Sequence, residues 1–193
     1  LVAGCASMQP AGPTAVAELK ATAGNRAAGT VSFTQRGDKV VVVASVTGLA
    51  PGSHGFHIHE KGDCSAPDGT SAGGHFNPLG KPHAHPTVAD RHAGDLPMLE
   101  ADASGNATLT ATIDLVTIGS GATDIVGRGV IVHKDPDDWK TQPTGNAGAR
   151  RQSKDDRLGK LAGSGIRAGR SAARNRRHRA RDVQLDHHRN DAP

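Results

Sequence analysis

Residues 55–60 read Gly55-Phe56-His57-Ile58-His59-Glu60, and this short stretch combines a strand pattern with two metal-binding side chains. In a β-strand, residues i and i+2 point to the same face, so His57 and His59 can bind one ion while Ile58 packs into the core. The stretch therefore predicts a metal site on a rigid element.

A second histidine series follows, with His75, His83 and His92 leading to Asp95. The spacing H-x7-H-x8-H-x2-D supplies three imidazoles and one carboxylate, which is a full tetrahedral set for zinc. The series lies in a segment rich in Gly and Pro that we expect to wrap around an ion. A further histidine, His133, ends an apolar, strand-like run. Together the histidines predict two metals close together.

The rest of the chain predicts one small β-domain. The only aromatic residues are three Phe and one Trp, so Val, Ile, Leu and Ala must fill the core, and 25 Gly and 11 Pro suit turns and long loops. Two irregular segments, 61–95 and 134–149, are long enough to be functional loops. Besides the strand that ends at His59, the pattern predicts strands at 15–21, 29–35, 39–47, 99–102, 107–115 and 129–133.

Five segments resemble copper/zinc superoxide dismutases: G-F-H-I-H-E-K-G-D-C, G-G-H-F-N-P, D-R-H-A-G-D-L, G-R-G-V-I-V-H and T-G-N-A-G-A-R. They span about residues 55–150. The resemblance implies an all-β Greek-key barrel or sandwich with two long functional loops. It also implies an enzyme that converts superoxide to dioxygen and hydrogen peroxide by redox cycling of copper.

The resemblance assigns roles residue by residue. The implied copper ligands are His57, His59, His75 and His133, and the implied zinc ligands are His75, His83, His92 and Asp95. His75 belongs to both sets, and the implied mechanism also makes it a proton carrier. Arg150 matches the arginine that guides the anion, although an ordinary surface arginine is the alternative.

Three further side chains near these motifs need interpretation. Asp137 matches an aspartate that joins a copper-site to a zinc-site histidine. The alternative is a solvated acidic loop shared with Asp135 and Asp138. We expect His54 to make a fixed hydrogen bond beneath the metal strand, and His85 to be exposed on its loop.

The N-terminus resembles the end of a bacterial lipoprotein signal. Small residues precede Cys5 in Leu-Val-Ala-Gly-Cys-Ala-Ser, which predicts acylation of Cys5, a flexible tether over 1–14 and a location in the periplasm or cell envelope. The alternative is an unmodified apolar N-terminus. No stretch is long and apolar enough to span a bilayer, so the only expected membrane contact is a lipid anchor at Cys5.

The balance of charged residues changes after Arg150, where the predicted superoxide dismutase domain, 15–150, ends. Residues 1–150 carry 11 Lys or Arg and 14 Asp or Glu, whereas 151–193 carry 12 and 5. We expect 151–193 to be a disordered basic tail, with the final strand missing. Its lack of aromatic residues argues against a nucleic-acid partner.

The same break affects a disulfide of the family. Cys64 matches one of its two cysteines, and Ser153 stands where the resemblance places the other. A reading-frame shift near codon 151 would explain this change. The alternative function is accordingly a non-catalytic or impaired copper/zinc-binding protein of the same fold.

Overall fold

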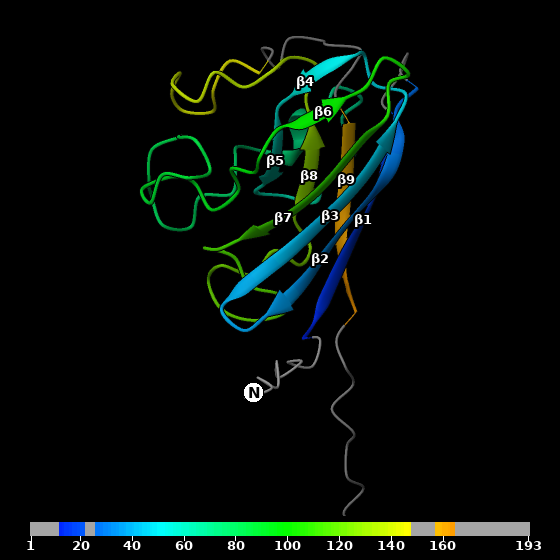
Figure 1. Ribbon diagram of the computed structural model, residues 1–193. Coiled ribbons are helices and arrows are strands. Elements are labelled where there is room, and N and C mark those ends of the chain that lie inside the picture. The colour runs from blue at the N-terminus through cyan, green and yellow to red at the C-terminus, as the bar shows by residue number, and fades with distance from the viewer. Residues whose placement is uncertain (1–11, 22–25, 148–156, 165–193) are drawn as a thin grey trace, which may run out of the picture.

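The computed structural model describes residues 12–21, 26–147 and the strand 157–164. Within these ranges the protein is an antiparallel sheet with the strand order β4-β6-β7-β3-β2-β1-β9-β8-β5 (Figure 1). The strands are β1 (Thr14–Ala21), β2 (Ala28–Arg36), β3 (Lys39–Thr47), β4 (Gly52–His54), β5 (Phe56–His59), β6 (Leu99–Ala101), β7 (Ala107–Ile113), β8 (Gly129–Val132) and β9 (Arg157–Ser164). One 3-10 turn, η1 (Thr70–Ala72), lies between β5 and β6. The predicted all-β fold class is confirmed, although the sheet is open between β4 and β5.

The first three strands owe their form to strict alternation. In β3, Val40, Val42, Ala44 and Val46 are buried, while the side chain of Val43 on the opposite face is 44% exposed. Burying a valine contributes about 1.5–3 kcal/mol, so such a face is enough to fix the register of the strand. The sequence pattern located these strands to within one residue at each end.

Strands β5 and β8 differ because all of their residues are buried. Phe56 and Ile58 belong to the hydrophobic core, so the alternating His57 and His59 lie on the other face of β5. In β8, Val130 and Val132 lie in the core while Ile131 contacts Ala72 outside it. The second face of these strands is therefore covered by loops.

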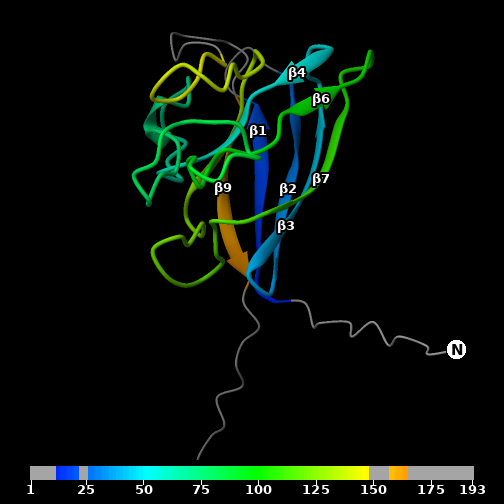
Figure 2. The same ribbon diagram turned by 60° about the vertical axis from the view of Figure 1, so that its left-hand side comes forward.

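Two long loops provide that cover. The segments 61–98 and 133–147 lie on the same side of the sheet, one above the other, in both ribbon views (Figure 1, Figure 2). They correspond to the predicted functional loops 61–95 and 134–149, of which residues 148 and 149 lie outside the described residues. Their position leaves the histidine face of β5 between a rigid sheet and irregular chain.

The expectation of a missing final strand is wrong. β9 lies within the predicted tail and pairs with β1 on one side (Leu161 opposite Ala17) and with β8 on the other (Gly159 opposite Val130). The reason is that β1 and β8 each have one other neighbour and would otherwise leave a row of backbone groups unpaired. Backbone hydrogen bonds stabilise any segment that lies in this gap, even one without an alternating apolar pattern. The predicted disorder is thus wrong for 157–164; the rest of the tail, with Ser153, lies outside the described residues.

The N-terminal prediction falls outside the described residues, which begin at Gly12, so acylation of Cys5 stays a prediction. Among the residues that are described, no helix has the length and apolar character needed to cross a membrane.

Candidate metal centre

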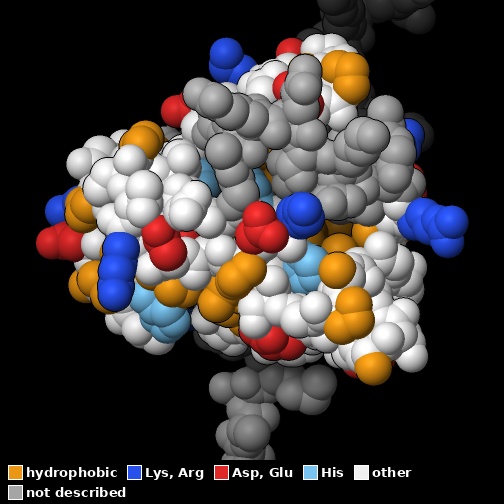
Figure 3. Space-filling model, turned by 90° about the horizontal axis from the view of Figure 1, so that it is seen from above, with side chains coloured by type: hydrophobic (Ala, Val, Ile, Leu, Met, Phe, Trp, Pro, Cys, Tyr) orange, Lys and Arg blue, Asp and Glu red, His pale blue; other side chains and the backbone are white. Residues whose placement is uncertain are grey.

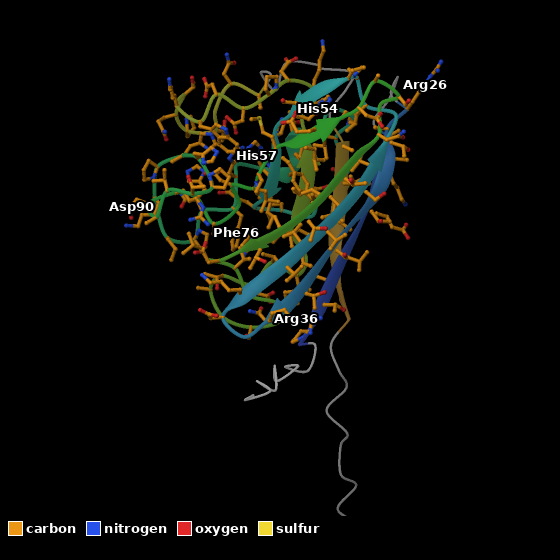
Figure 4. The ribbon with its side chains drawn as sticks, in the orientation of Figure 1. Arg26, Arg36, His54, His57, Phe76 and Asp90 are labelled. Atoms are coloured by element: carbon orange, nitrogen blue, oxygen red, sulfur yellow. The ribbon has the colours of Figure 1, made fainter. Side chains whose placement is uncertain are left out.

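The edge of β5 that does not pair with β8 positions the first ligand candidates through backbone hydrogen bonds to the loop. Ile58 N–H donates to the Gly94 carbonyl at 2.9 Å, and Phe76 N–H donates to the Ile58 carbonyl at 2.8 Å. Bridges of this kind set His75 opposite His59 and Asp95 opposite His57. A Cβ atom at Gly94 would lie 2.3 Å from the Ile58 carbonyl oxygen, so only glycine allows this approach. Figure 4 shows His57 on the side of the sheet that faces the loops.

His133 reaches the same place from the end of β8. Its N–H donates to the Gly55 carbonyl at 2.7 Å, and Gly55 N–H donates to the Asp135 carbonyl at 2.9 Å. These two bonds hold the start of the 133–147 loop against the start of β5. The ring centroids of His57 and His133 are consequently 4.9 Å apart.

Two groups of nitrogen and oxygen atoms result, each with all its atoms within 4.8 Å of one another. All seven side chains are buried, and His75 belongs to both groups. The first group is His57, His59, His75 and His133, and the second is His75, His83, His92 and Asp95. The structure thus brings together every residue predicted to be a metal ligand, in the two predicted sets.

The second group converges on one carboxylate oxygen. Asp95 Oδ1 lies 2.9 Å from His75 Nδ1, 3.0 Å from His83 Nδ1 and 3.6 Å from His92 Nδ1. Burial raises the pKa of Asp95, but hydrogen bonds from His75 and His83, together with the nearby His92 imidazole, outweigh it and hold this pKa far below its ordinary value. The carboxylate is therefore ionised, as a metal ligand must be.

Asp137 joins the two groups. His57 Nε2 donates to its Oδ2 at 2.6 Å, and His83 Nε2 donates to its Oδ1 at 3.1 Å. Although burial raises the pKa of Asp137, these two hydrogen bonds lower it well below the usual range. The alternative of a solvated acidic loop is thereby excluded for Asp137, which is 6% exposed, whereas Asp135 is exposed and Asp138 half-buried.

Burial determines the protonation of the first group. Desolvation lowers the pKa of His57 and His133, and lowers that of His75 to about 3. His83 behaves differently: burial lowers its pKa, but hydrogen bonds to Asp137 and Asp95 outweigh it and raise the pKa to about 9. When no metal is bound, these shifts favour neutral imidazoles at His57, His75 and His133 and a protonated imidazole at His83.

The residues fit two metal ions. The buried Nδ1 atoms of His57 and His92 have no hydrogen-bond partner, which is costly unless something else binds there. His59 Nδ1 donates to the Gly73 carbonyl at 3.0 Å, which leaves Nε2 as the acceptor that can bind a metal. All-imidazole coordination suits copper, and three imidazoles with a carboxylate suit zinc.

The pocket above the second group gives access from solvent. It has a volume of about 480 Å³ and is lined by His75 and His92, with Glu60 and Thr144 among the other residues at its wall. Seen from above, histidine side chains show at the surface in only a few places among neighbouring polar groups (Figure 3). His75 and His92 are only 3% and 5% exposed, so little of either ring faces this pocket.

Two of the histidines that the structure describes lie outside both groups, as expected. His54 is buried, with Nδ1 2.8 Å from the His133 carbonyl and Nε2 2.9 Å from the Ala50 carbonyl. His54 therefore holds the backbone beneath the site instead of binding metal. His85 is exposed and its Nδ1 lies 2.8 Å from Thr87 Oγ1.

Sequence reasoning missed several residues that hold the site in place. The Gln142 side chain makes two hydrogen bonds with the His83 backbone, at 2.9 and 2.8 Å, and Asp137 N–H donates to Met98 Sδ at 3.3 Å. The Trp139 ring stacks on the His83 ring, and Gly145 lies next to Asp137 Oδ1 and His83 Nε2. The one available signal was that this irregular loop contains the chain's only tryptophan. Arg150 lies outside the described residues.

The match to a family model is consistent with this geometry. The model described as copper/zinc superoxide dismutase matches residues 27–152, which is more than half of the chain. The chain belongs to the copper/zinc superoxide dismutase family. Its metals are therefore copper and zinc, in agreement with the two groups of ligand atoms.

Two relatives of this superoxide dismutase family member are informative. An extracellular Cu-Zn superoxide dismutase of Caenorhabditis elegans is 43% identical over 128 residues, which is 63% of this chain and 57% of the relative. The chain thus spans a little more than half the length of that protein. The crystal structure of the clock protein EA4 matches with a TM-score of 0.68 and 36% identity, covering 80% of this chain and 96% of that one.

Proposed function

We propose that this protein is a superoxide dismutase that converts two superoxide anions and two protons to dioxygen and hydrogen peroxide. The observation that supports this most directly is the pair of buried ligand groups that share His75, next to a pocket open to solvent. A shared imidazole is a feature that neither a single structural zinc site nor a copper store requires.

The proposed copper ligands are His57, His59, His75 and His133, and the proposed zinc ligands are His75, His83, His92 and Asp95. When bound, copper supplies a one-electron redox couple that superoxide can both reduce and reoxidise, and zinc supplies a fixed positive charge. Asp137 orients the rings of both groups through His57 Nε2 and His83 Nε2.

The remaining roles concern the proton and the anion. His75 Nδ1 lies 2.9 Å from Asp95 Oδ1, on the side of the proposed zinc ligands, so Nε2 is the atom that can hold a proton for the peroxide product. Arg150 is proposed to attract and orient the superoxide anion, because its guanidinium is always charged and offers several donors.

A pair of matched variants tests the assignment. Asp95→Asn removes the carboxylate at which the proposed zinc ligands meet, whereas Asp90→Asn makes the same change at an exposed position of the same loop, where Asp90 pairs with Lys81. After loading with both metals, Asp95→Asn should lose zinc and keep copper, while Asp90→Asn should keep both and remove superoxide like the wild type.

Metal analysis and a superoxide-removal assay measure both results. Equal loss of copper and zinc from a folded Asp95→Asn variant would contradict the ligand sets. A wild type that binds both metals but leaves superoxide unchanged would favour the impaired alternative. That alternative depended on a missing closing strand, and β9 occupies this position, which favours an active protein.

The proposed location is outside the cytoplasm, supported by the cysteine motif at the N-terminus and by the extracellular relative. The proposed anchor is a lipid on Cys5. Radiolabelled fatty acid supplied to the producing cells should label the wild type and not Cys5→Ser.

A further inference from the structure

The side chain of Trp139 lies against both histidines that Asp137 joins. Its ring centroid is 5.7 Å from that of His83, with the planes 21° apart, and 6.2 Å from that of His57, with the planes at 81°. These separations are in the range of favourable stacked and edge-to-face aromatic pairs. The indole therefore supports the two rings from outside the ligand groups.

The backbone of Trp139 is unusual as well. Its φ of 56° lies in the left-handed region, which costs a bulky residue about 1–2 kcal/mol relative to glycine. In this conformation Trp139 N–H donates to Asp137 Oδ1 at 3.0 Å, the oxygen that also accepts from His83. A strained residue beside a functional carboxylate suggests that the strain serves the site.

His83 depends on this support more than His57 does. His57 is part of β5, where the backbone is held by β8 on one side and by the loop on the other. His83 instead belongs to an irregular loop, and its ring is held by Asp95, Asp137 and the Trp139 indole. Loss of the indole should therefore loosen His83 first.

We propose that Trp139 is a positioning residue for zinc: its indole covers the His83 imidazole while its backbone N–H fixes the Asp137 carboxylate. The inference rests on the proposed zinc ligands. Trp139 touches no substrate and acts only through His83 and Asp137. The ring restrains His83 in the orientation that binds zinc, so its main effect is on the rate at which zinc leaves.

Two variants separate the ring from the backbone. Trp139→Phe keeps an aromatic ring in a residue that meets the same backbone cost. Trp139→Asn removes the ring but tolerates the left-handed conformation well. A purely structural role for the backbone predicts that Asn is at least as good as Trp, whereas stacking predicts that Asn is worse and Phe is close to wild type.

The measurement is the rate of zinc release from the fully metal-loaded, full-length protein to a chelating dye, well below the melting temperature. We expect release about tenfold faster from Trp139→Asn, within about threefold of wild type from Trp139→Phe, and copper content unchanged in both, since aromatic pairs of this kind contribute a modest free energy. Because Trp139 is the only tryptophan, adding zinc to the metal-free wild type should also change its emission.

The outcomes distinguish this inference from the function on which it rests. A wild type that binds no zinc overturns both. A wild type that binds zinc, with Trp139→Asn releasing it at the wild-type rate or Trp139→Phe releasing it as fast as Asn, overturns the role of Trp139 alone. Tryptophan emission that does not change when zinc is added would also contradict the proposed role of Trp139.

Discussion

Gly145 is the position where a single added methyl group should do most damage to the site. It has a φ of 71°, and a Cβ atom there would lie 2.1 Å from Asp137 Oδ1 and 2.8 Å from His83 Nε2. Neither atom can yield without breaking the hydrogen bond between them. Gly145→Ala must therefore displace the Asp137 carboxylate.

The size of the effect follows from two separate costs. The left-handed backbone costs alanine about 1–2 kcal/mol, and a displaced carboxylate loses hydrogen bonds worth about 1.5–3 kcal/mol each. We expect Gly145→Ala to lower the free energy of unfolding of the metal-free protein by about 3–5 kcal/mol in total. Gly80→Ala is the matched control, because its φ is 62° and no atom lies within 4 Å of the added Cβ; it should lose only about 1–2 kcal/mol.

Urea unfolding of the two variants measures both costs, and metal analysis measures the effect on zinc. In an Asp137→Ala background the nearer clash partner is absent, so Gly145→Ala should then cost less than it does in the unchanged protein, and what remains above the cost of Gly80→Ala comes from the 2.8 Å contact with His83 Nε2. Equal losses for Gly145→Ala and Gly80→Ala in the otherwise unchanged protein would refute the reasoning, since they would show that the carboxylate moves freely.

Four further predictions concern the charged residues and the strand β9. Zinc binding at pH 8 should release about one proton from His83, whose pKa is raised to about 9 in the folded metal-free protein, and calorimetry in buffers of different ionisation enthalpy measures this release. For the same reason the stability from His83 is full below its unfolded pKa of about 6.5 and declines as the pH rises to about 9, so metal-free melting temperatures that increase over this interval would argue against it. Deleting 157–193 should lower the melting temperature sharply, because it removes β9 from between β1 and β8, whereas deleting 165–193 should not. Arg150→Ala should slow superoxide removal at low salt without loss of either metal, and unchanged activity would reduce Arg150 to an ordinary surface residue.

The local sequence pattern was sufficient to locate strands and ligands whose residues lie close together in sequence. Alternation located β1, β2 and β3, and the i, i+2 spacing placed His57 and His59 on one face of β5. The sequence also indicated the seven side chains that meet in the structure, because imidazoles and a carboxylate at these spacings seldom occur together except around a metal. It failed for β4, which has only three residues, and for β9, whose pattern is not that of a strand.

Only the tertiary structure decided what surrounds those ligands. The resemblance to the family had indicated Asp137, but nothing indicated Trp139 or Gly145. Both are more than 50 positions from His83 in sequence, and no periodicity connects an irregular loop to another irregular loop. Their contacts exist because both loops fold back over the same face of the sheet. The strand β9 also depends on the tertiary structure. The unpaired edges of β1 and β8 exist only once the sheet has folded, and β9 pairs with them through backbone hydrogen bonds, which the pattern of side chains does not reveal.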